Sequence, residues 1–129
     1  LAIEGPAVYL SAKAAEVLTL AIHELATNSI KYGALGCEGR LAIRWFVTRR
    51  ESCEWLEVMW EENCPEPVVA PSRRGFGTEL IEGRVPYELR GEGTISVRPE
   101  GLLAEIAFPL EAGASILEPG ADSGRGNSE

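Results

Sequence analysis

The chain has 129 residues, of which 45% are hydrophobic and 25% are charged, a composition that fits one soluble globular domain. Its net charge of -8, with only 12 Lys and Arg residues, excludes the basic surface of a typical nucleic-acid-binding protein. No apolar run approaches the length of a membrane span, so we expect a domain that makes no membrane contact. Three widely spaced cysteines, Cys37, Cys53 and Cys64, match no zinc or redox spacing and favour a reduced, cytoplasmic setting. The start at Leu1, without Met, suggests a piece of a longer protein.

The chain begins with an arm and a long helix. Residues 1–10 alternate loosely and contain Gly5-Pro6, which predicts a short strand or extended arm at a sheet edge. Ser11 is a plausible N-cap for a helix that runs without Pro or Gly as far as Gly33. We expect its apolar face to pack on a sheet. The apolar face comprises Leu18, Ile22, Leu25 and Ala26. Val17 and Leu20 are expected on the polar side of the helix, below the polar residues.

A polar stripe follows at the end of this helix. Glu24, Asn28 and Lys31 stand at i, i+4 and i+7, which places a carboxylate, an amide and an ammonium on one side. Hard oxygens suit Mg²⁺ and a cation suits phosphate oxygens, so this stripe indicates a metal-phosphate ligand. The alternative is a solvated helix face with the same charge spacing.

Two alternating runs, 40–49 and 54–61, predict a hairpin turned at 51–53, whose apolar side lies on the helix. A proline-rich stretch over 63–74 then predicts an ordered loop or lid. Gly75-Phe76-Gly77-Thr78 leads into a short helix, and such a glycine turn exposes backbone N–H groups that can bind an anion. A plain turn in which Thr78 caps the helix is the alternative.

The rest of the pattern sets the fold class. A second helical piece is expected from Pro86 to Leu89, and a last hairpin over 93–98 and 102–109. The order predicts an α+β fold, a two-layer sandwich in which helices cover one face of a mostly antiparallel sheet. We expect one domain over 1–111 and a disordered C-terminal tail over 112–129, where Gly, Ser, Pro and charge prevail.

Three of these motifs, in this order, resemble a known family. His23-Glu24-x-x-x-Asn28-x-x-Lys31-Tyr32, the Trp60-Glu61-Glu62 triplet and the Gly75-Phe76-Gly77-Thr78 turn resemble the ATP-binding catalytic domain of HWE-family sensor histidine kinases. The family is named for a histidine and a Trp-x-Glu, which correspond here to His23, Trp60 and Glu62. The resemblance extends from Gly5-Pro6 to Pro109 and implies the Bergerat-type ATP-binding fold.

The resemblance also implies roles for individual residues. Asn28 would coordinate Mg²⁺, and Lys31 would contact phosphate. Glu24 would be the acidic residue that interacts with the metal or with water, or that transfers a proton. Tyr32 would lie along the nucleotide, and the Glu62 carboxylate would accept a hydrogen bond from the adenine amino group. The phosphates would be surrounded by Gly75, Phe76, Gly77 and Thr78. His23 would steady the motif, with Trp60 in support, and the alternative for His23 is a histidine packed in the core.

As a whole the resemblance implies a kinase that uses ATP and Mg²⁺. The domain would donate the γ-phosphoryl group to a histidine on a dimerisation domain outside this chain, and the parent homodimer would pass it to a response regulator receiver domain. The family has glycines after Trp-x-Glu, where this chain has Asn63, Cys64 and Pro65, so we expect lower nucleotide affinity or a differently set lid. Alternatives are a serine kinase or ATPase of the same fold, and a degenerate nucleotide-binding or interaction module without catalysis.

Overall fold

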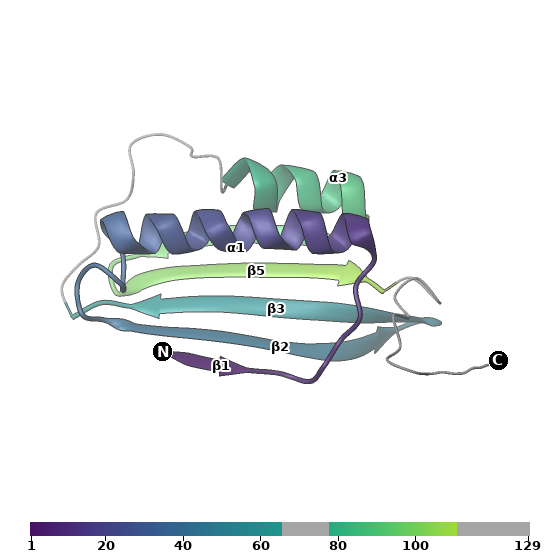
Figure 1. Cartoon of the computed structure of the whole chain (residues 1–129), viewed down its shortest axis with the longest axis horizontal. Helices are drawn as coiled ribbons and strands as arrows, with labels where there is room; N and C mark the ends of the chain where they lie inside the picture. The colour runs from purple at the N-terminus through teal and green to yellow at the C-terminus, as the bar shows by residue number, and fades with distance from the viewer. Residues whose placement is uncertain (66–77, 111–129) are drawn as a thin grey trace.

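The computed structural model describes residues 1–65 and 78–110, which form one sheet with helices on one face (Figure 1). The sheet has five strands in the order β1-β2-β3-β5-β4, with β1 parallel to β2 and all other neighbours antiparallel. This confirms the predicted two-layer α+β sandwich. The elements in chain order are β1 (Ala2–Glu4), α1 (Ala12–Tyr32), β2 (Arg40–Arg50), β3 (Cys53–Asn63), η1 (Glu79–Arg84), α3 (Val85–Leu89), β4 (Glu92–Arg98) and β5 (Gly101–Pro109).

Helix α1 begins at the predicted cap. The Ser11 hydroxyl accepts a hydrogen bond from the backbone N–H of Ala14 at 3.1 Å, and the helix ends at Gly33. The buried side of α1 is rotated slightly from the predicted apolar face. Val17, which was expected on the polar side, is fully buried. Helical spacing explains the observed line of buried residues, which comprises Ala14, Val17, Ala21, Leu25 and Ser29.

The β2–β3 hairpin is longer than its sequence pattern predicted. All eleven positions of each strand pair, from Arg40 opposite Asn63 to Arg50 opposite Cys53, so the turn consists of Glu51 and Ser52 alone. Glu51 adopts a φ of 55°, the left-handed conformation that lets so short a turn close. The long hairpin carries the end of β3 to the C-terminal end of α1 (Figure 1).

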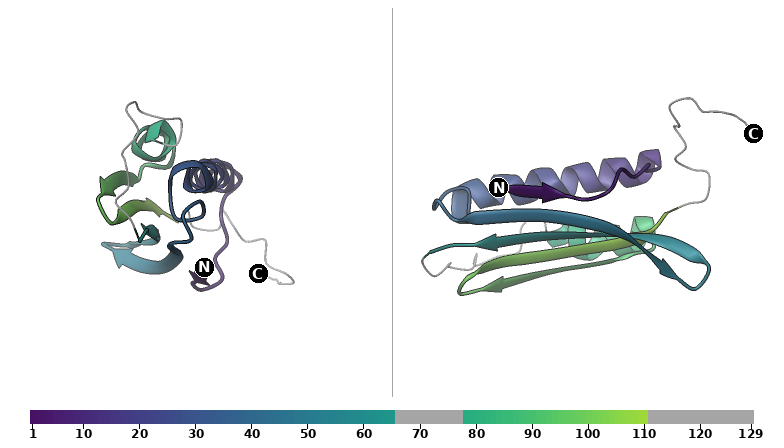
Figure 2. Two further views of the ribbon diagram at one scale, coloured as in Figure 1. Left: turned by 90° about the vertical axis from the view of Figure 1, so that its left-hand side faces the viewer. Right: turned by 90° about the horizontal axis from the view of Figure 1, so that it is seen from below.

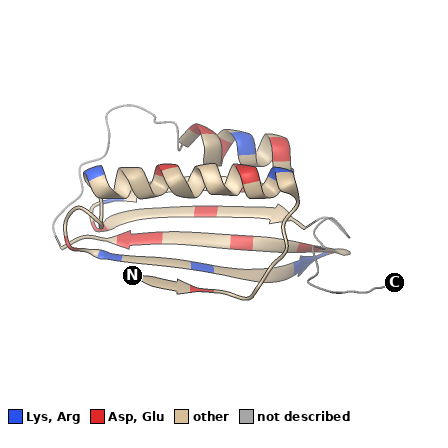
Figure 3. Cartoon of the chain, viewed as in Figure 1, with Lys and Arg blue, Asp and Glu red and all other residues tan. Residues whose placement is uncertain are grey.

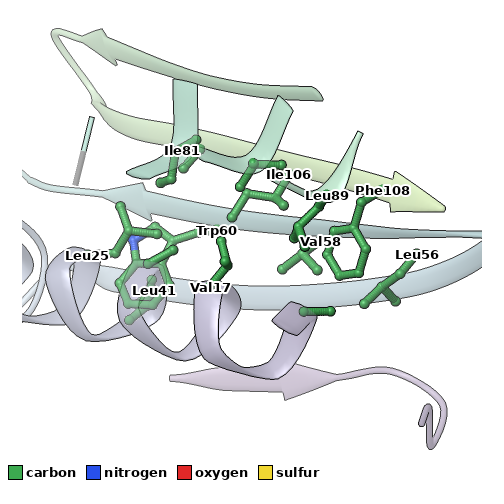
Figure 4. Close-up of a cluster of buried hydrophobic side chains, with 14 of the residues drawn as sticks. Val17, Leu25, Leu41, Leu56, Val58, Trp60, Ile81, Leu89, Ile106 and Phe108 are labelled. Atoms are coloured by element: carbon green, nitrogen blue, oxygen red, sulfur yellow. The ribbon is translucent and has the colours of Figure 1, made fainter. Parts of the chain in front are cut away.

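The core lies between the sheet and the helices (Figure 4). Alternation on β3 buries Leu56, Val58 and Trp60 as predicted, and β5 adds Ile106 and Phe108. Leu80, Ile81 and Val85 close the core from η1 and α3 and are fully buried. End-on, α1 and the η1–α3 segment lie beside each other on the same face of the sheet (Figure 2).

The short helices follow the sequence prediction, with one correction. Thr78 has helical φ and ψ, and its side chain makes no capping hydrogen bond to η1, so the predicted cap is wrong.

Several predicted features lie outside the described residues. They are Gly75, Phe76, Gly77, most of the proline-rich loop and the tail predicted over 112–129. None of the helices in the described ranges is long and apolar enough to cross a membrane. Acidic and basic residues are interspersed along the helices and strands (Figure 3).

Candidate functional site

The polar stripe is continuous on α1 because no residue breaks the helix between Glu24 and Lys31. The Glu24 side chain is 27% exposed, Asn28 is half-buried and Lys31 is exposed. Within residues 1–65 and 78–110, neither the Asn28 amide nor the Lys31 ammonium has a hydrogen bond or ion pair. Polar groups left without partners at the end of a helix are available to a ligand.

His23 does not lie in the core. Its side chain is 74% exposed, and Nδ1 lies 3.9 Å from Oε2 of Glu24. The alternative of a packed core histidine is therefore wrong. The residue stands on the side of α1 opposite the line that contains Ala21 and Leu25, as helical spacing requires.

Glu62 is a buried carboxylate at the end of β3, 4% exposed. Its Oε1 accepts hydrogen bonds from the Ala34 backbone N–H at 2.8 Å and from the Ser29 hydroxyl at 3.1 Å. Its Oε2 accepts from Nε1 of Trp60 at 2.6 Å. Burying a carboxylate is unfavourable unless hydrogen bonds replace its water, and these three donors do so. We call Glu62, Trp60, Ser29 and the backbone of Ala34 the Glu62 cluster.

Two residues of this region were not singled out by sequence reasoning. Ser29 is 1% exposed, donates to Glu62 and accepts from the backbone N–H of Leu35 at 3.0 Å. The signal was a serine four residues after Leu25, on the line of buried positions. Gly33, predicted only as the helix stop, lies so close that a Cβ there would sit against Oε1 of Glu62. Any larger residue at Gly33 would displace the carboxylate.

Known proteins resemble this chain in sequence. It is 36% identical over 109 residues, or 84% of its length, to a blue-light-activated histidine kinase of Brucella anthropi. It is 34% identical over 107 residues to the protein of the same name from Brucella ovis. The chain is homologous to the histidine kinases. No family model matches it.

Solved structures show the same fold as this histidine kinase homologue. The histidine kinase domain of the Erythrobacter litoralis EL346 blue-light-activated histidine kinase superposes with a TM-score of 0.61 over 84% of this chain and 50% of that chain, at 18% identity. The longer EL346 protein superposes with a TM-score of 0.57. The chain spans about a fifth (22%) of the length of its Brucella relatives. The resemblance to sensor histidine kinases found from the motifs is confirmed.

In this histidine kinase homologue two further predicted residues, Tyr32 and Thr78, lie within the described ranges. Tyr32 ends α1 and is 60% exposed. Thr78 is half-buried directly before η1, and its hydroxyl makes no capping hydrogen bond to that helix. β3 ends at Asn63 and η1 starts at Glu79.

The donor set fits Mg²⁺ held chiefly by a phosphate ligand. No group of three or more His, Cys, Asp or Glu side chains within the described ranges is placed to bind a metal ion by itself. The Asn28 amide oxygen and the Glu24 carboxylate, one turn apart, are the hard oxygens that Mg²⁺ takes. Mg²⁺ commonly uses one or two protein ligands and completes its shell with water and substrate phosphates.

Proposed function

We propose that this chain is the ATP-binding catalytic domain of a cytoplasmic, HWE-type two-component sensor histidine kinase. In the parent homodimer it donates the γ-phosphoryl group of ATP to a histidine on a dimerisation domain, and a response regulator receiver domain receives it next. The observation that carries the proposal is the stripe of Glu24, Asn28 and Lys31 beside the Glu62 cluster, in a chain homologous to histidine kinases. Within residues 1–65 and 78–110, the Asn28 and Lys31 side chains of this stripe have no hydrogen bond or ion pair.

Each residue of the stripe has a part in the proposed reaction. Asn28 and Glu24 hold Mg²⁺, which when bound neutralises charge on the phosphates. Lys31 contacts phosphate oxygens as a point charge, and Tyr32 lies along the nucleotide. The Thr78 hydroxyl, with Gly75, Phe76 and Gly77, contacts the phosphates at the start of η1. Phosphoryl transfer is mostly positioning and charge stabilisation, so these contacts supply what the chain must contribute.

Glu62 selects the base in this proposal. Among residues 1–65 and 78–110, its Oε2 has one donor, the Trp60 indole, and a carboxylate oxygen can accept two hydrogen bonds. The free position accepts the adenine amino group, whereas guanine and hypoxanthine present a carbonyl there, which repels a carboxylate. Discrimination of this kind is worth about 1–3 kcal/mol, or roughly ten- to a hundredfold in affinity.

Calorimetry on the 129-residue chain tests the proposal. We expect ATP to bind with Mg²⁺ and to bind at least roughly tenfold more weakly with EDTA. Asn28→Asp, which adds a negative charge facing the phosphates, is expected to abolish this binding and leave the melting temperature unchanged. Ser96→Asp adds the same charge on the exposed edge strand β4 and is the matched control. Normal ATP binding by Asn28→Asp would remove the stripe from the site.

A second candidate function is a degenerate interaction module that binds no nucleotide. The observation in its favour is that Glu62 already accepts three hydrogen bonds and is 4% exposed, which suffices for a purely structural role. Comparing ATP with inosine triphosphate on the unchanged protein separates the two without a destabilising mutation. A preference for ATP supports the kinase domain, equal affinities confine Glu62 to structure, and no binding of either nucleotide supports the module.

A further inference from the structure

Two cysteines far apart in the sequence meet beside the Glu62 cluster. Sγ of Cys37 lies 2.6 Å from Sγ of Cys64, although the residues are 27 positions apart, and both are free thiols. This separation is shorter than a non-bonded contact between sulfur atoms and is close to the S–S bond length of about 2.05 Å. The contact therefore places two thiols where a bond between them needs little movement of the backbone.

The register of the β2–β3 hairpin explains this meeting. Arg40 pairs with Asn63, so Gly39 and Cys64 stand opposite each other just beyond the last pair. A Cβ on Gly39 would meet the backbone of Asn63 and Cys64, which shows how closely the two segments approach. The backbone N–H of Cys64 bonds to the carbonyl of Glu100 at 2.9 Å, and that of Cys37 to the carbonyl of Ala34 at 3.3 Å. Both cysteines are thus held in place by backbone hydrogen bonds.

We propose that Cys37 and Cys64 form a reversible disulfide under peroxide and that this bond restricts access to Glu62. In the first step the Cys37 sulfur attacks one peroxide oxygen, the O–O bond breaks, and a sulfenic acid and water form. In the second step the Cys64 sulfur attacks that sulfenic sulfur, the S–O bond breaks, and the hydroxide leaves as a second water with the Cys64 proton. The two sulfurs lose two electrons in total, which reduce the peroxide.

The order of the two steps follows from the surroundings of the thiols. Burial, followed by the hydrogen bond with Cys37 and the nearby charge of Glu62, raises the pKa of the Cys64 thiol to about 11. Cys64 therefore remains a thiol at neutral pH and is not the first nucleophile. Formation of the disulfide from the sulfenic acid is expected to become faster as pH rises, because the thiolate fraction of Cys64, the attacking group of the second step, grows about tenfold per pH unit below this pKa.

The bond would join the same two segments that Glu62 joins by hydrogen bonds. Residues 33–39 contact Glu62 through the Ala34 N–H, and Cys64 follows Glu62 by two positions. Since Glu62 is 4% exposed, an adenine amino group reaches it only when this loop moves. A covalent bond at Cys37 opposes that movement. This part of the inference rests on the proposed function, and it predicts weaker ATP binding in the oxidised protein.

The test oxidises the 129-residue chain with hydrogen peroxide and follows thiols, mass and nucleotide binding. We expect the monomer to lose two thiols and two hydrogens, a peptide linking Cys37 to Cys64 after proteolysis, and full reversal by dithiothreitol. Cys53 is the internal control, because in the described part of the chain its sulfur hydrogen-bonds to the carbonyls of Glu54 and Leu110 and to no other thiol. Cys53→Ser should form the bond, whereas Cys37→Ser and Cys64→Ser should not.

The outcomes separate the two parts of the inference. A link through Cys53, dimers joined between chains, or an unchanged thiol count would overturn the disulfide. If the bond forms, the oxidised protein is expected to bind Mg-ATP at least about fivefold more weakly than the reduced protein, the lower end of common coupling between sites. Equal affinities would overturn the effect on access. Failure of the reduced protein to bind ATP would overturn that effect and the proposed function, and would leave the disulfide result standing.

Discussion

The two ends of α1 use polar side chains in opposite ways. At the N-terminal end, Lys13 lies 3.3 Å from Glu88 and Glu16 lies 4.0 Å from Arg84, so the charges pair with the η1–α3 segment at the surface. At the C-terminal end, a buried cluster around Glu62 fixes the helix, and the surface residues Asn28 and Lys31 have no partner in the described ranges.

This difference indicates how one helix serves both architecture and binding. Surface ion pairs each contribute little to stability, so the N-terminal end is held mainly by the Ser11 cap and by apolar packing. At the other end, stability comes from below the surface, through Ser29 and Ala34 to Glu62. The side chains of Asn28 and Lys31 are therefore not needed to hold the helix in place, and in the proposed function they bind the ligand.

The largest expected effect comes from removing the buried carboxylate. Glu62→Ala leaves the Trp60 indole N–H and the Ala34 backbone N–H buried without an acceptor, and each such group costs about 1–3 kcal/mol. We expect the free energy of unfolding to fall by about 3 kcal/mol and the melting temperature by roughly 10 °C. Urea unfolding and thermal melts measure both.

Glu61→Ala is the matched control for that change. Glu61 is the preceding residue of β3, its side chain is 41% exposed, and it lies 4.0 Å from Arg44. Its removal is expected to change stability by less than about 0.5 kcal/mol. Similar losses for Glu61→Ala and Glu62→Ala would show that the buried cluster does not hold the C-terminal end of α1.

The next effect belongs to the N-terminal end. Ser11→Ala removes the acceptor for the Ala14 N–H, and loss of an N-cap typically costs about 1 kcal/mol, or a few degrees in melting temperature. Ser96→Ala, at an exposed position on β4, serves as control. A loss as large as that of Glu62→Ala would reverse the ranking of the two ends.

A smaller, pH-dependent effect is expected at Glu88. The hydrogen bond from Arg84, followed by a smaller one from Lys13, lowers the pKa of the Glu88 carboxyl to about 2 against burial, which acts in the opposite direction. A lowered folded-state pKa stabilises the protein at pH values above the unfolded-state pKa, near 4.5, and this stabilisation is lost as pH falls toward 2. Glu88→Gln should therefore melt slightly below the unmodified protein at pH 7, and the difference should vanish at pH 2. A difference that persists at pH 2 would contradict an ionic origin.

The smallest effect is expected for His23. Because its side chain is 74% exposed, His23→Ala should change the melting temperature by less than the Ser11→Ala change does. A histidine packed in the core, the alternative considered from the sequence, would instead lose stability on this change. A loss above about 2 kcal/mol in urea unfolding would show that the imidazole packs against the domain.

Local patterns predicted most of this fold. The period of 3.6 in α1 and the alternation in β2, β3 and β5 depend on neighbours in the chain, and they located the elements to within a few residues. The sheet layer and the edge position of β1 followed from these elements and from Pro6. The rotation of α1 was missed slightly, because the predicted face includes Leu18 and Ile22, which are only partly buried, whereas Val17 is fully buried.

Contacts between distant segments could not be predicted in this way. The three donors to Glu62 come from α1, the loop after it and β3, and only the register of the folded sheet brings them together. The same register brings the Cys37 and Cys64 thiols into contact, and no sequence spacing indicates this contact. Motifs therefore selected the candidate site residues but did not reveal that the Glu62 carboxylate is part of the buried hydrogen-bond network.

The β2–β3 hairpin has a consequence for the order in which the molecule assembles. The turn at Glu51 and Ser52 has two residues, like the turn between Arg98 and Gly101, and such short loops close easily. We therefore expect β2 and β3 to begin pairing at Arg50 and Cys53 and to proceed along eleven positions toward Arg40 and Asn63. Glu62 stands one position before the end of this path. The carboxylate thus meets Ser29 and Ala34 only after the hairpin has zipped along almost its whole length, and the proposed ligand site is among the last parts of the domain to assemble.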